Sequence, residues 1–360
     1  MRKTLVALLI CLMALAIFPA FAQEDVVEVV VTLTGDCTLG SEDRTRKDAT
    51  SFDSYINTRG YGYPFSQVQS LFSHDDVTVI NLEGVFYNSS GNRMEKTYNF
   101  RGPTDFARIL TAGNIEAVYV GNNHIIDYGT AGFKSTIRAL EEVGVPWFAT
   151  TNSYCNTFIF EKEGFKVGFT GAYTATFGGA RAKMEQDMQT LKDAGCDAII
   201  AVMHGGMEYS PIRMQGQERL AAWYVRNGAT VVVGHHPHVV QGMDLMEGAS
   251  VIYSLGNFSF GGNAQLRATQ ALLAQVTLRF DREKGYLGHQ VNLIPVAPSS
   301  TLEYNNFRPV ILKGDEARAV MELAQHDTPF ELAPYVEGVG AVQPFVPAPK
   351  AEKPEQKAVI

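Results

Sequence analysis

Cysteine is scarce in this sequence, with 4 in 360 residues. Cys11 lies in an apolar segment near the start of the chain, and Cys37, Cys155 and Cys196 are widely spaced. These last three cysteines are odd in number and far apart in the sequence, which excludes a disulfide framework and allows one bridge at most. We expect none to be needed, because a chain of this length with 46% apolar residues can bury a large core.

Several motifs are absent as well. There is no G-x-S-x-G elbow and no Walker-type phosphate loop, which excludes the hydrolases built on them. Cys37 is disfavoured as a nucleophile because the charge of the adjacent Asp36 raises the pKa of its thiol. The formal charge of −8 argues against nucleic acid as a partner.

The first 22 residues have the pattern of a secretory signal peptide. Arg2 and Lys3 make a basic start, residues 5–18 are almost all apolar, and Ala20-Phe21-Ala22 places small residues where a signal peptidase cuts. We expect cleavage after Ala22 and export to the periplasm, the cell envelope or the medium. An uncleaved anchor is the alternative, but the apolar run is shorter than the roughly 20 residues of a spanning helix.

Strand-like and helix-like runs alternate along the rest of the chain. The pattern predicts an α/β fold with largely parallel strands, followed by an antiparallel pair at 268–280 and 288–296. We expect one domain over residues 23–340, a polar loop at 41–64 and a disordered tail at 341–360. The strand-like runs are 27–34, 77–80, 117–120, 167–170, 198–203, 230–233 and 251–254, and the helix-like runs are 106–110, 130–143, 182–194 and 217–227.

Residues that bind metals or transfer protons follow five of these strand-like runs. The carboxyl ends of strands in an open α/β sheet form the edge where ligands bind, so these residues are expected to converge. Each one alone has an ordinary explanation as a turn former or core histidine, but five of the 8 histidines lie in these strand-end motifs. The strand-end candidates are Asp36, Asn81, Glu83, Asn123, His124, His204, His236 and His238.

Carboxylates, an amide carbonyl and imidazoles form a mixed oxygen and nitrogen ligand set. Such a set suits Mn, Fe or Zn better than Ca. Glu83 is placed to bridge two ions, with Asp36 on one ion and Asn123 and His204 on the other. Ions held in this way would polarise a phosphoryl oxygen and acidify a bound water.

The same motifs contain candidate catalytic and substrate-binding residues. His124 follows a ligand asparagine and is placed to protonate a leaving group, and Asp127 three residues later is placed to orient its imidazole. Asn81, Glu208 and Asn257 are candidate substrate contacts. A solvated loop acid explains Glu208 equally well, and a structural turn is the alternative for the segment that ends in Asn257.

Six motifs occur in a fixed order between about residues 27 and 296. They are Gly35-Asp36-x-x-Leu39-Gly40, Asn81-Leu82-Glu83-Gly84, Asn122-Asn123-His124-x-x-Asp127-Tyr128-Gly129, His204-Gly205-Gly206-x-Glu208-Tyr209, Gly234-His235-His236-Pro237-His238 and Tyr253-Ser254-Leu255-Gly256-Asn257-Phe258. The chain thereby resembles the CapA-type capsule synthesis (poly-γ-glutamate) family, which is similar to calcineurin-like metallophosphoesterases. The resemblance implies a four-layer α/β sandwich, in which helices flank two mixed sheets. It also implies a catalytic role for His124 and metal roles for Asp36, Glu83, Asn123, His204, His236 and His238.

The sequence differs from the phosphoesterase pattern at three positions. Thr38 stands where those enzymes have a histidine, Glu83 replaces their bridging aspartate, and no acid directly follows His124. One metal position therefore lacks a nitrogen ligand. A centre of two ions, a centre of one ion and a metal-free binding site all stay open.

The resemblance implies a role in making, exporting or anchoring γ-linked polyglutamate, together with membrane-bound capsule synthesis machinery. The alternative is a secreted metal-dependent phosphoesterase or hydrolase that acts on a phosphorylated small molecule, and whether the chain is an enzyme stays open. An anionic polymer needs basic contacts near the site. Candidates in loops close to the motifs are Arg59, Arg93, Arg101 and Arg213, with Arg101 preferred as a substrate contact.

Overall fold

The structure is a computed structural model that describes residues 26–262, 265, 267–301 and 303–349. The predicted signal segment at 1–22, its cleavage site and residues 350–360 of the predicted tail lie outside the described residues. Among the described residues, no helix combines the length and the apolar character needed to cross a membrane.

The first sheet is built around one long strand, β1 (Val26–Thr38). The first part of β1 pairs antiparallel with β15 (Ala271–Asp281), and β1 also runs parallel to β2 (Val77–Leu82) and, near its end, to β14 (Asn257–Phe260). Beyond β2 the sheet continues with the parallel strands β5 (Ala117–Tyr119) and β6 (Trp147–Thr150). β15 pairs antiparallel with β16 (Gly285–Ala297), which confirms the predicted antiparallel pair.

The second sheet consists mainly of parallel strands: β9 (Phe165–Tyr173), β10 (Ala198–His204), β11 (Val231–His235) and β13 (Ala249–Ile252). Three antiparallel strands complete it: β7 (Cys155–Asn156), β8 (Phe158–Lys162) and β12 (Met243–Met246). β6 joins the two sheets, because it pairs with β5 on one side and with β9 on the other.

Strand β10 shows how its sequence produces layers. Its side chains alternate between two faces, and both faces are apolar. Ile200 and Val202 pack into the core between the sheets, whereas Ile199, Ala201 and Met203 belong to a second apolar cluster. Helices α5 (Phe177–Asp193) and α6 (Gln215–Arg226) close this second cluster.

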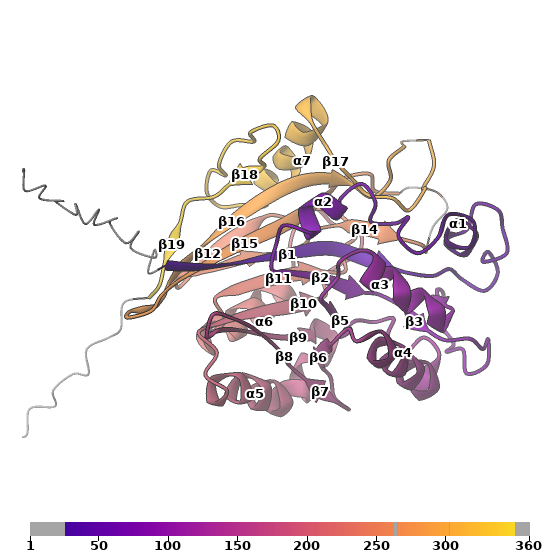
Figure 1. Ribbon diagram of the computed structural model, residues 1–360, viewed down its shortest axis with the longest axis horizontal. Coiled ribbons are helices and arrows are strands. Elements are labelled where there is room, and N and C mark those ends of the chain that lie inside the picture. The colour runs from indigo at the N-terminus through magenta and orange to yellow at the C-terminus, as the bar shows by residue number, and fades with distance from the viewer. Residues whose placement is uncertain (1–25, 263–264, 266, 302, 350–360) are drawn as a thin grey trace, which may run out of the picture.

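Helix α7 (Gly314–His326) packs on β16, and α5 and α7 lie on opposite sides of the molecule in Figure 1. The prediction of an α/β fold with two mixed sheets flanked by helices is therefore confirmed. The remaining helices are α1 (Phe52–Arg59), α2 (Gln69–Phe72), α3 (Arg108–Ala112), α4 (Gly129–Val143) and the 3-10 turns Thr104–Ala107 and Thr174–Thr176. The remaining strands are β3 (Val85–Phe86), β4 (Arg101–Gly102), β17 (Val310–Ile311), β18 (Ala341–Val342) and β19 (Val346–Pro347).

Two predictions about irregular segments are wrong. The segment 41–64 contains helix α1, which is capped by Ser51 and anchored by the buried side chains of Phe52 and Ile56. The predicted tail begins too early, because β18 and β19 both pair with β16. Backbone N–H and C=O groups on the edge of β16 pair with this Pro-rich segment. Amino-acid composition alone does not indicate such pairing.

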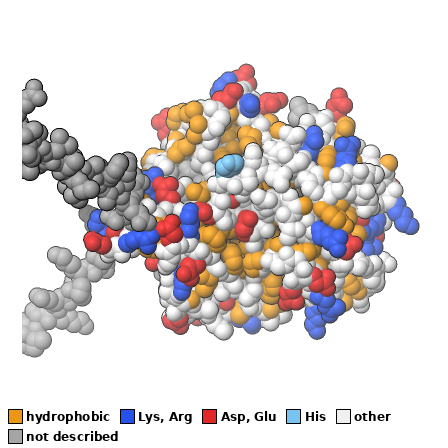
Figure 2. All heavy atoms as spheres, viewed as in Figure 1, with side chains coloured by type: hydrophobic (Ala, Val, Ile, Leu, Met, Phe, Trp, Pro, Cys, Tyr) orange, Lys and Arg blue, Asp and Glu red, His pale blue; other side chains and the backbone are white. Residues whose placement is uncertain are grey.

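Acidic and basic side chains are interspersed on the face of the molecule shown in Figure 2. This face carries no extended basic patch that would attract a polyanion over a long distance. Recognition of an anionic polymer would therefore have to rest on a few local contacts.

Glu116 lies at the start of β5 and makes the stability of the fold depend on pH. Its Oε2 accepts a hydrogen bond from the Thr78 backbone N–H at 2.7 Å, and burial raises the pKa of Glu116 to about 7. A carboxyl group whose pKa is raised by folding stabilises the fold fully below its unfolded pKa and loses that contribution as the pH rises through its folded pKa.

Glu116→Gln should therefore gain stability relative to the wild type between about pH 5 and about pH 8, on the order of 1 kcal/mol after allowance for solvent screening. Urea unfolding at both pH values measures the difference. The exposed Glu161→Gln is the control and should follow the wild type. A constant difference between Glu116→Gln and the wild type at both pH values would contradict the prediction.

Candidate metal centre

The strand register brings the predicted residues to one edge of the two sheets. Asp36 on β1 pairs with Asn81 on β2 and with Asn257 on β14, and His204 on β10 pairs with His235 on β11. Gly35 allows the close approach of β1 to the turn before β14, since a Cβ there would lie 2.2 Å from the Gly256 carbonyl oxygen. The predicted ligands on these strand ends are buried: Asp36, Glu83, His204, His236 and His238.

Glu83 lies at the centre of this edge. Its backbone is held by β1, because its N–H donates to the Cys37 carbonyl at 2.8 Å and its carbonyl accepts from the Thr38 hydroxyl at 2.9 Å. Its side chain is fully buried, and neither carboxylate oxygen has a hydrogen-bond partner among the described residues. A buried carboxylate without partners is costly, which indicates that a cation belongs beside it.

Glu83 Oε1 is surrounded by imidazole nitrogens at distances too long for hydrogen bonds. The Nε2 atoms of His124 and His204 lie 3.8 Å away, and the Nε2 atom of His238 lies 3.9 Å away. A gap of this size between a carboxylate and several imidazoles fits a shared metal ion better than direct contact.

Two groups of potential ligands share Glu83. One comprises Asp36, Glu83 and His238, and the other comprises Glu83, His204 and His236, with the ligand atoms of each group within 4.8 Å of one another. His236 Nδ1 is also buried and has no hydrogen-bond partner in the part of the chain that the structure describes. The residues therefore fit a divalent ion, and a carboxylate common to both groups fits a pair of ions with Glu83 between them.

Asp36 is held in place by its neighbours on the other sheet. His238 Nδ1 lies 3.0 Å from Asp36 Oδ2, and His235 Nδ1 lies 3.2 Å from Asp36 Oδ1. Burial acts to raise the pKa of Asp36, but the hydrogen bonds and charges of these two histidines outweigh it and hold the pKa well below its usual value. Asp36 is therefore a permanent carboxylate, as a metal ligand must be.

The other titratable groups respond to burial and to the charges around Glu83. Burial, with the charge of Asp36, raises the pKa of Glu83 well above its usual value. Burial lowers the pKa of His204 well below its usual value and that of His236 to about 4, so both imidazoles are neutral and able to bind a metal. Burial also acts to lower the pKa of His238, but Glu83 and Asp36 raise it to about 9. The two carboxylates thus hold His238 as a cation when no metal is bound, and His238 has to lose this proton to bind an ion.

Asparagine amides orient the ligands. The Asn81 amide donates to Asp36 Oδ1 at 2.8 Å, and its own oxygen accepts from Asn122 at 2.9 Å. Asn123 Oδ1 lies 2.7 Å from His204 Nε2, and Asn257 Oδ1 lies 2.9 Å from His238 Nδ1. Asn81 and Asn257, which the sequence suggested as substrate contacts, and Asn123, which it suggested as a metal ligand, are thus placed against metal-ligand candidates.

His124 and Asp127 form the pair that their spacing predicts. His124 Nδ1 lies 2.8 Å from Asp127 Oδ2, an oxygen that also accepts from the Phe100 N–H at 2.6 Å. Lys96 Nζ contacts Asp127 Oδ1 at 2.5 Å and donates to the Asn123 carbonyl at 2.9 Å. Since Nδ1 of His124 is engaged by Asp127, Nε2 is the atom that faces Glu83. Burial lowers the pKa of His124, although the hydrogen bond that His124 donates to Asp127 opposes this.

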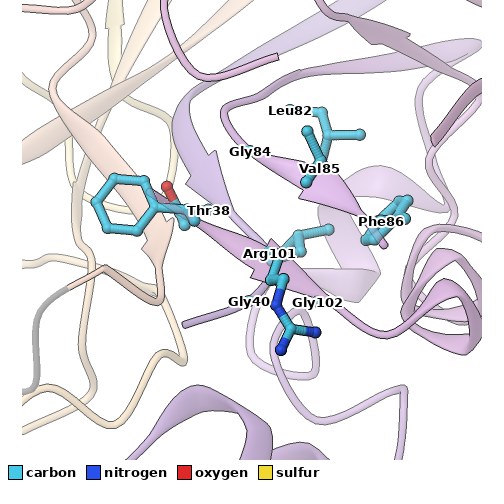
Figure 3. Close-up of a pocket in the computed structure, with 10 residues that line it drawn as sticks. Thr38, Gly40, Leu82, Gly84, Val85, Phe86, Arg101 and Gly102 are labelled. Carbon is cyan, nitrogen blue, oxygen red and sulfur yellow. The ribbon is translucent and has the colours of Figure 1, made fainter. Parts of the chain in front are cut away.

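Arg101 lies away from these ligands. Its guanidinium donates to Asp43 at 2.6 Å and to the Tyr87 carbonyl at 3.0 Å. Figure 3 shows that the guanidinium points away from Leu82 and Val85. The pocket that these residues line, beside β3 and β4, has no space for a water molecule. Glu208 does line a cavity above the centre, next to His124 and His238.

Three residues of the site were missed in the sequence. His235 and Asn122 lie inside predicted motifs and could have been included as neighbours of ligands. Lys96 lies in the irregular segment after β3, and no motif or periodicity marks it. The rejection of Cys37 as a nucleophile agrees with the structure, where burial raises the pKa of its thiol to about 12.

Glu83→Gln tests whether the buried carboxylate requires a cation. Without metal, we expect this variant to be at least as stable as the wild type, because burial and the charge of Asp36 already drive the Glu83 carboxyl group toward its neutral form, which an amide matches in charge and size. A divalent ion at about 100 times its Kd should stabilise the wild type by about 2.7 kcal/mol and leave the variant unchanged. Thermal unfolding with chelator and with Mn²⁺ measures both effects.

Glu42→Gln is the matched control, because Glu42 is also buried and also has an oxygen without a hydrogen-bond partner, but it lies outside both ligand groups. It should keep the full response to metal. Stabilisation of Glu83→Gln by Mn²⁺ as large as that of the wild type would show that Glu83 is not a ligand.

Comparison with known proteins places this geometry in a family. The chain is 27% identical over 277 residues to the capsule biosynthesis protein CapA of Bacillus anthracis, covering 70% of this chain and 64% of that protein. It is 27% identical over 214 residues to the PGA biosynthesis protein CapA of Bacillus subtilis (strain 168), covering 54% of this chain and 56% of that protein. The chain thus spans less than two thirds of the length of either relative.

Among solved structures, a 5'-nucleotidase from Candida albicans SC5314 aligns with 83% of this chain and 57% of its own, at 9% identity and a TM-score of 0.39, which is too low to support an argument. The family model described as bacterial capsule synthesis protein PGA_cap matches residues 30–262. That range contains every candidate ligand from Asp36 to His238, and it covers more than half of the sequence. This chain belongs to the bacterial capsule synthesis protein PGA_cap family.

Proposed function

We propose that this chain acts in the synthesis, export or anchoring of an anionic capsule polymer, γ-linked polyglutamate, and that it does so through a divalent-metal centre bridged by Glu83. The observation that carries the metal centre is the buried Glu83 carboxylate, without hydrogen bonds, shared by two groups of ligands. The names of the two Bacillus relatives support the capsule role.

Asp36 and His238 would hold one ion, His204 and His236 the other, and Glu83 both. The mixed oxygen and nitrogen donors suit Mn, Fe or Zn. A bound ion of this kind supplies Lewis-acid polarisation of a carbonyl or phosphoryl oxygen and lowers the pKa of water. We favour two ions because the two ligand groups are separate except for Glu83.

His124 supplies the proton chemistry. Its Nε2 faces the centre, while Asp127 holds Nδ1 and so selects the tautomer and the ring orientation. Lys96 in turn contacts the other oxygen of Asp127, Oδ1, and its Nζ also lies 3.3 Å from His124 Nδ1. With Nδ1–H donated to Asp127, the neutral imidazole presents a proton acceptor at Nε2. Nε2 would first take a proton from the attacking water and would then pass it to the leaving group of a bound substrate, which for a γ-linked polymer is an amide nitrogen.

A second function is favoured by the same His124–Asp127 pair: a secreted metal-dependent phosphoesterase or hydrolase with a different substrate, such as a phosphorylated small molecule. A third function is that of a capsule-assembly factor, which binds the polymer without cleaving it. The proposed export rests on the basic and apolar pattern of residues 1–22, and the proposed partner is membrane-bound capsule synthesis machinery.

Metal content tests the centre directly. The wild type should hold two divalent ions, and His204→Ala and His238→Ala should each lose about one of them, since each removes a ligand from one group. Elemental analysis after loading with Mn, Fe or Zn gives the count. Loss of all metal in both variants would replace the two-ion centre by a single shared ion.

His289→Ala is the control for loss of a buried imidazole. His289 bonds to Ser250 and Tyr286, away from the centre, so this variant should keep its metal. A wild type that holds no metal after loading would overturn the proposed metal centre and leave a metal-free binding site.

Polymer yield tests the role in the cell. In a polymer-producing strain that lacks this gene, the wild-type gene should restore the polymer and Glu83→Gln should leave it at the level of the deletion. Glu161→Gln, which changes an exposed acid on β8 that lines neither the cavity above the centre nor the one beside it, should restore it. Full polymer yield in the deletion strain would contradict the capsule role, and full restoration by Glu83→Gln would separate that role from the metal centre.

A further inference from the structure

A small cavity opens directly above the metal centre. The imidazoles of His124 and His238 line it on the side of the ligands. The rest of its wall consists of the rings of Phe100 and Phe260 and of four polar side chains, those of Tyr98, Tyr209, Glu208 and Arg267. Any group bound at the centre therefore lies next to these four side chains. The mechanism described above uses none of them, so their chemistry is unassigned.

Arg267 is an exposed guanidinium that forms no ion pair with any of the described residues. Its Cζ lies 5.8 Å from the centroid of the Tyr209 ring. The neighbouring phenols of Tyr209 and Tyr98, which line the same cavity, raise the pKa of Arg267. Guanidinium N–H groups and phenol O–H groups are all hydrogen-bond donors. Arg267 and the two phenols thus present several donors together, as an oxyanion requires.

Three other cations named above are paired with acids. Lys96 is paired with Asp127, and Arg101 with Asp43. Arg213, a sequence candidate for the polymer, lies within 4 Å of Glu218, Asp244 and Asp327. Arg267 is the guanidinium that lines the cavity above the centre without an acidic partner among the described residues.

We propose that Arg267, with the phenol groups of Tyr98 and Tyr209, binds an oxyanion of the substrate, a carboxylate or a phosphate, beside the group that occupies the metal centre. The proposal rests on the proposed function, because it names the substrate chemistry of that same site. Glu208, on the same cavity, offers an acceptor for an N–H group next to the oxyanion, which favours the carboxylate of an amide-linked chain.

Arg267 also lines a second cavity, of about 320 Å³, together with Ser41, Thr45, Ser51 and Phe307. One guanidinium therefore borders both the space above the centre and a larger space beyond it. A substrate of several units would pass Arg267 with one unit on each side, whereas a single small molecule would fill only the first cavity.

Calorimetric binding to metal-loaded protein tests the proposal with two probes, a trimer of γ-linked glutamate and inorganic phosphate. Arg267→Gln should weaken binding of the recognised anion at least tenfold, and Tyr209→Phe should weaken it by a smaller factor because the ring is kept. Arg226→Gln, an exposed arginine on α6, should bind like the wild type.

The two arms distinguish the anion. Arg267-dependent binding of the trimer supports a carboxylate polymer, and Arg267-dependent binding of phosphate alone supports a phosphorylated substrate. Equal affinity of Arg267→Gln and the wild type for both probes, or no binding of either probe to metal-loaded wild type, would overturn the oxyanion site. Absence of metal from the wild type would instead be a failure of the proposed function, and metal content is measured on the same samples.

Discussion

The structure of this site depends on one electrostatic constraint. The carboxylate of Glu83 is completely buried and has no hydrogen-bond partner among the described residues. Glu83 gains nothing from hydrogen bonds, yet its backbone is fixed to β1 at both its N–H and its carbonyl. Removing a charge from water without compensation costs several kcal/mol. The surrounding sheet therefore positions the carboxylate for a cation, and the two ligand groups on either side of it are the natural source of further coordination.

The histidine side of the centre carries backbone strain of its own. His236 has φ of 98° and His238 has φ of 60°, a region that non-glycine residues seldom adopt. Such residues cost of order 1–3 kcal/mol each and persist where the surrounding structure enforces them. Here the strain turns the chain sharply after β11, so that His236 joins one ligand group and His238 the other. Two ligands from one short loop, on either side of Glu83, could not be reached by a relaxed extended strand.

The sequence predicted the positions of the strand ends well because parallel strands share one carboxyl edge, so residues such as Asp36 and His204 had to meet. It could not predict features that depend on packing across the sheets. Lys96 reaches the site from an irregular segment, and β18 and β19 form because β16 offers a free edge. Gly113 follows α3 with a φ of −100°, outside the left-handed region, so its backbone conformation does not require glycine. Glycine is needed there because a Cβ would lie 2.3 Å from the ring of Phe65.

The net negative charge of an acidic protein repels an anionic polymer at long range. Binding of such a polymer therefore has to come from local attraction. The chain carries a formal charge of −8, and charges of both signs are mixed on the visible face of Figure 2, so the approach of a polyanion gains little from the overall field. Attraction has to be concentrated where acids do not neutralise it. Lys96 forms an ion pair with Asp127, and Arg101 forms one with Asp43. Arg267 and the metal centre are therefore the adjacent sources of positive charge at the cavity. Two cationic points side by side fit a substrate with repeated anionic groups, because one unit would be held at Arg267 while the next is presented to the centre.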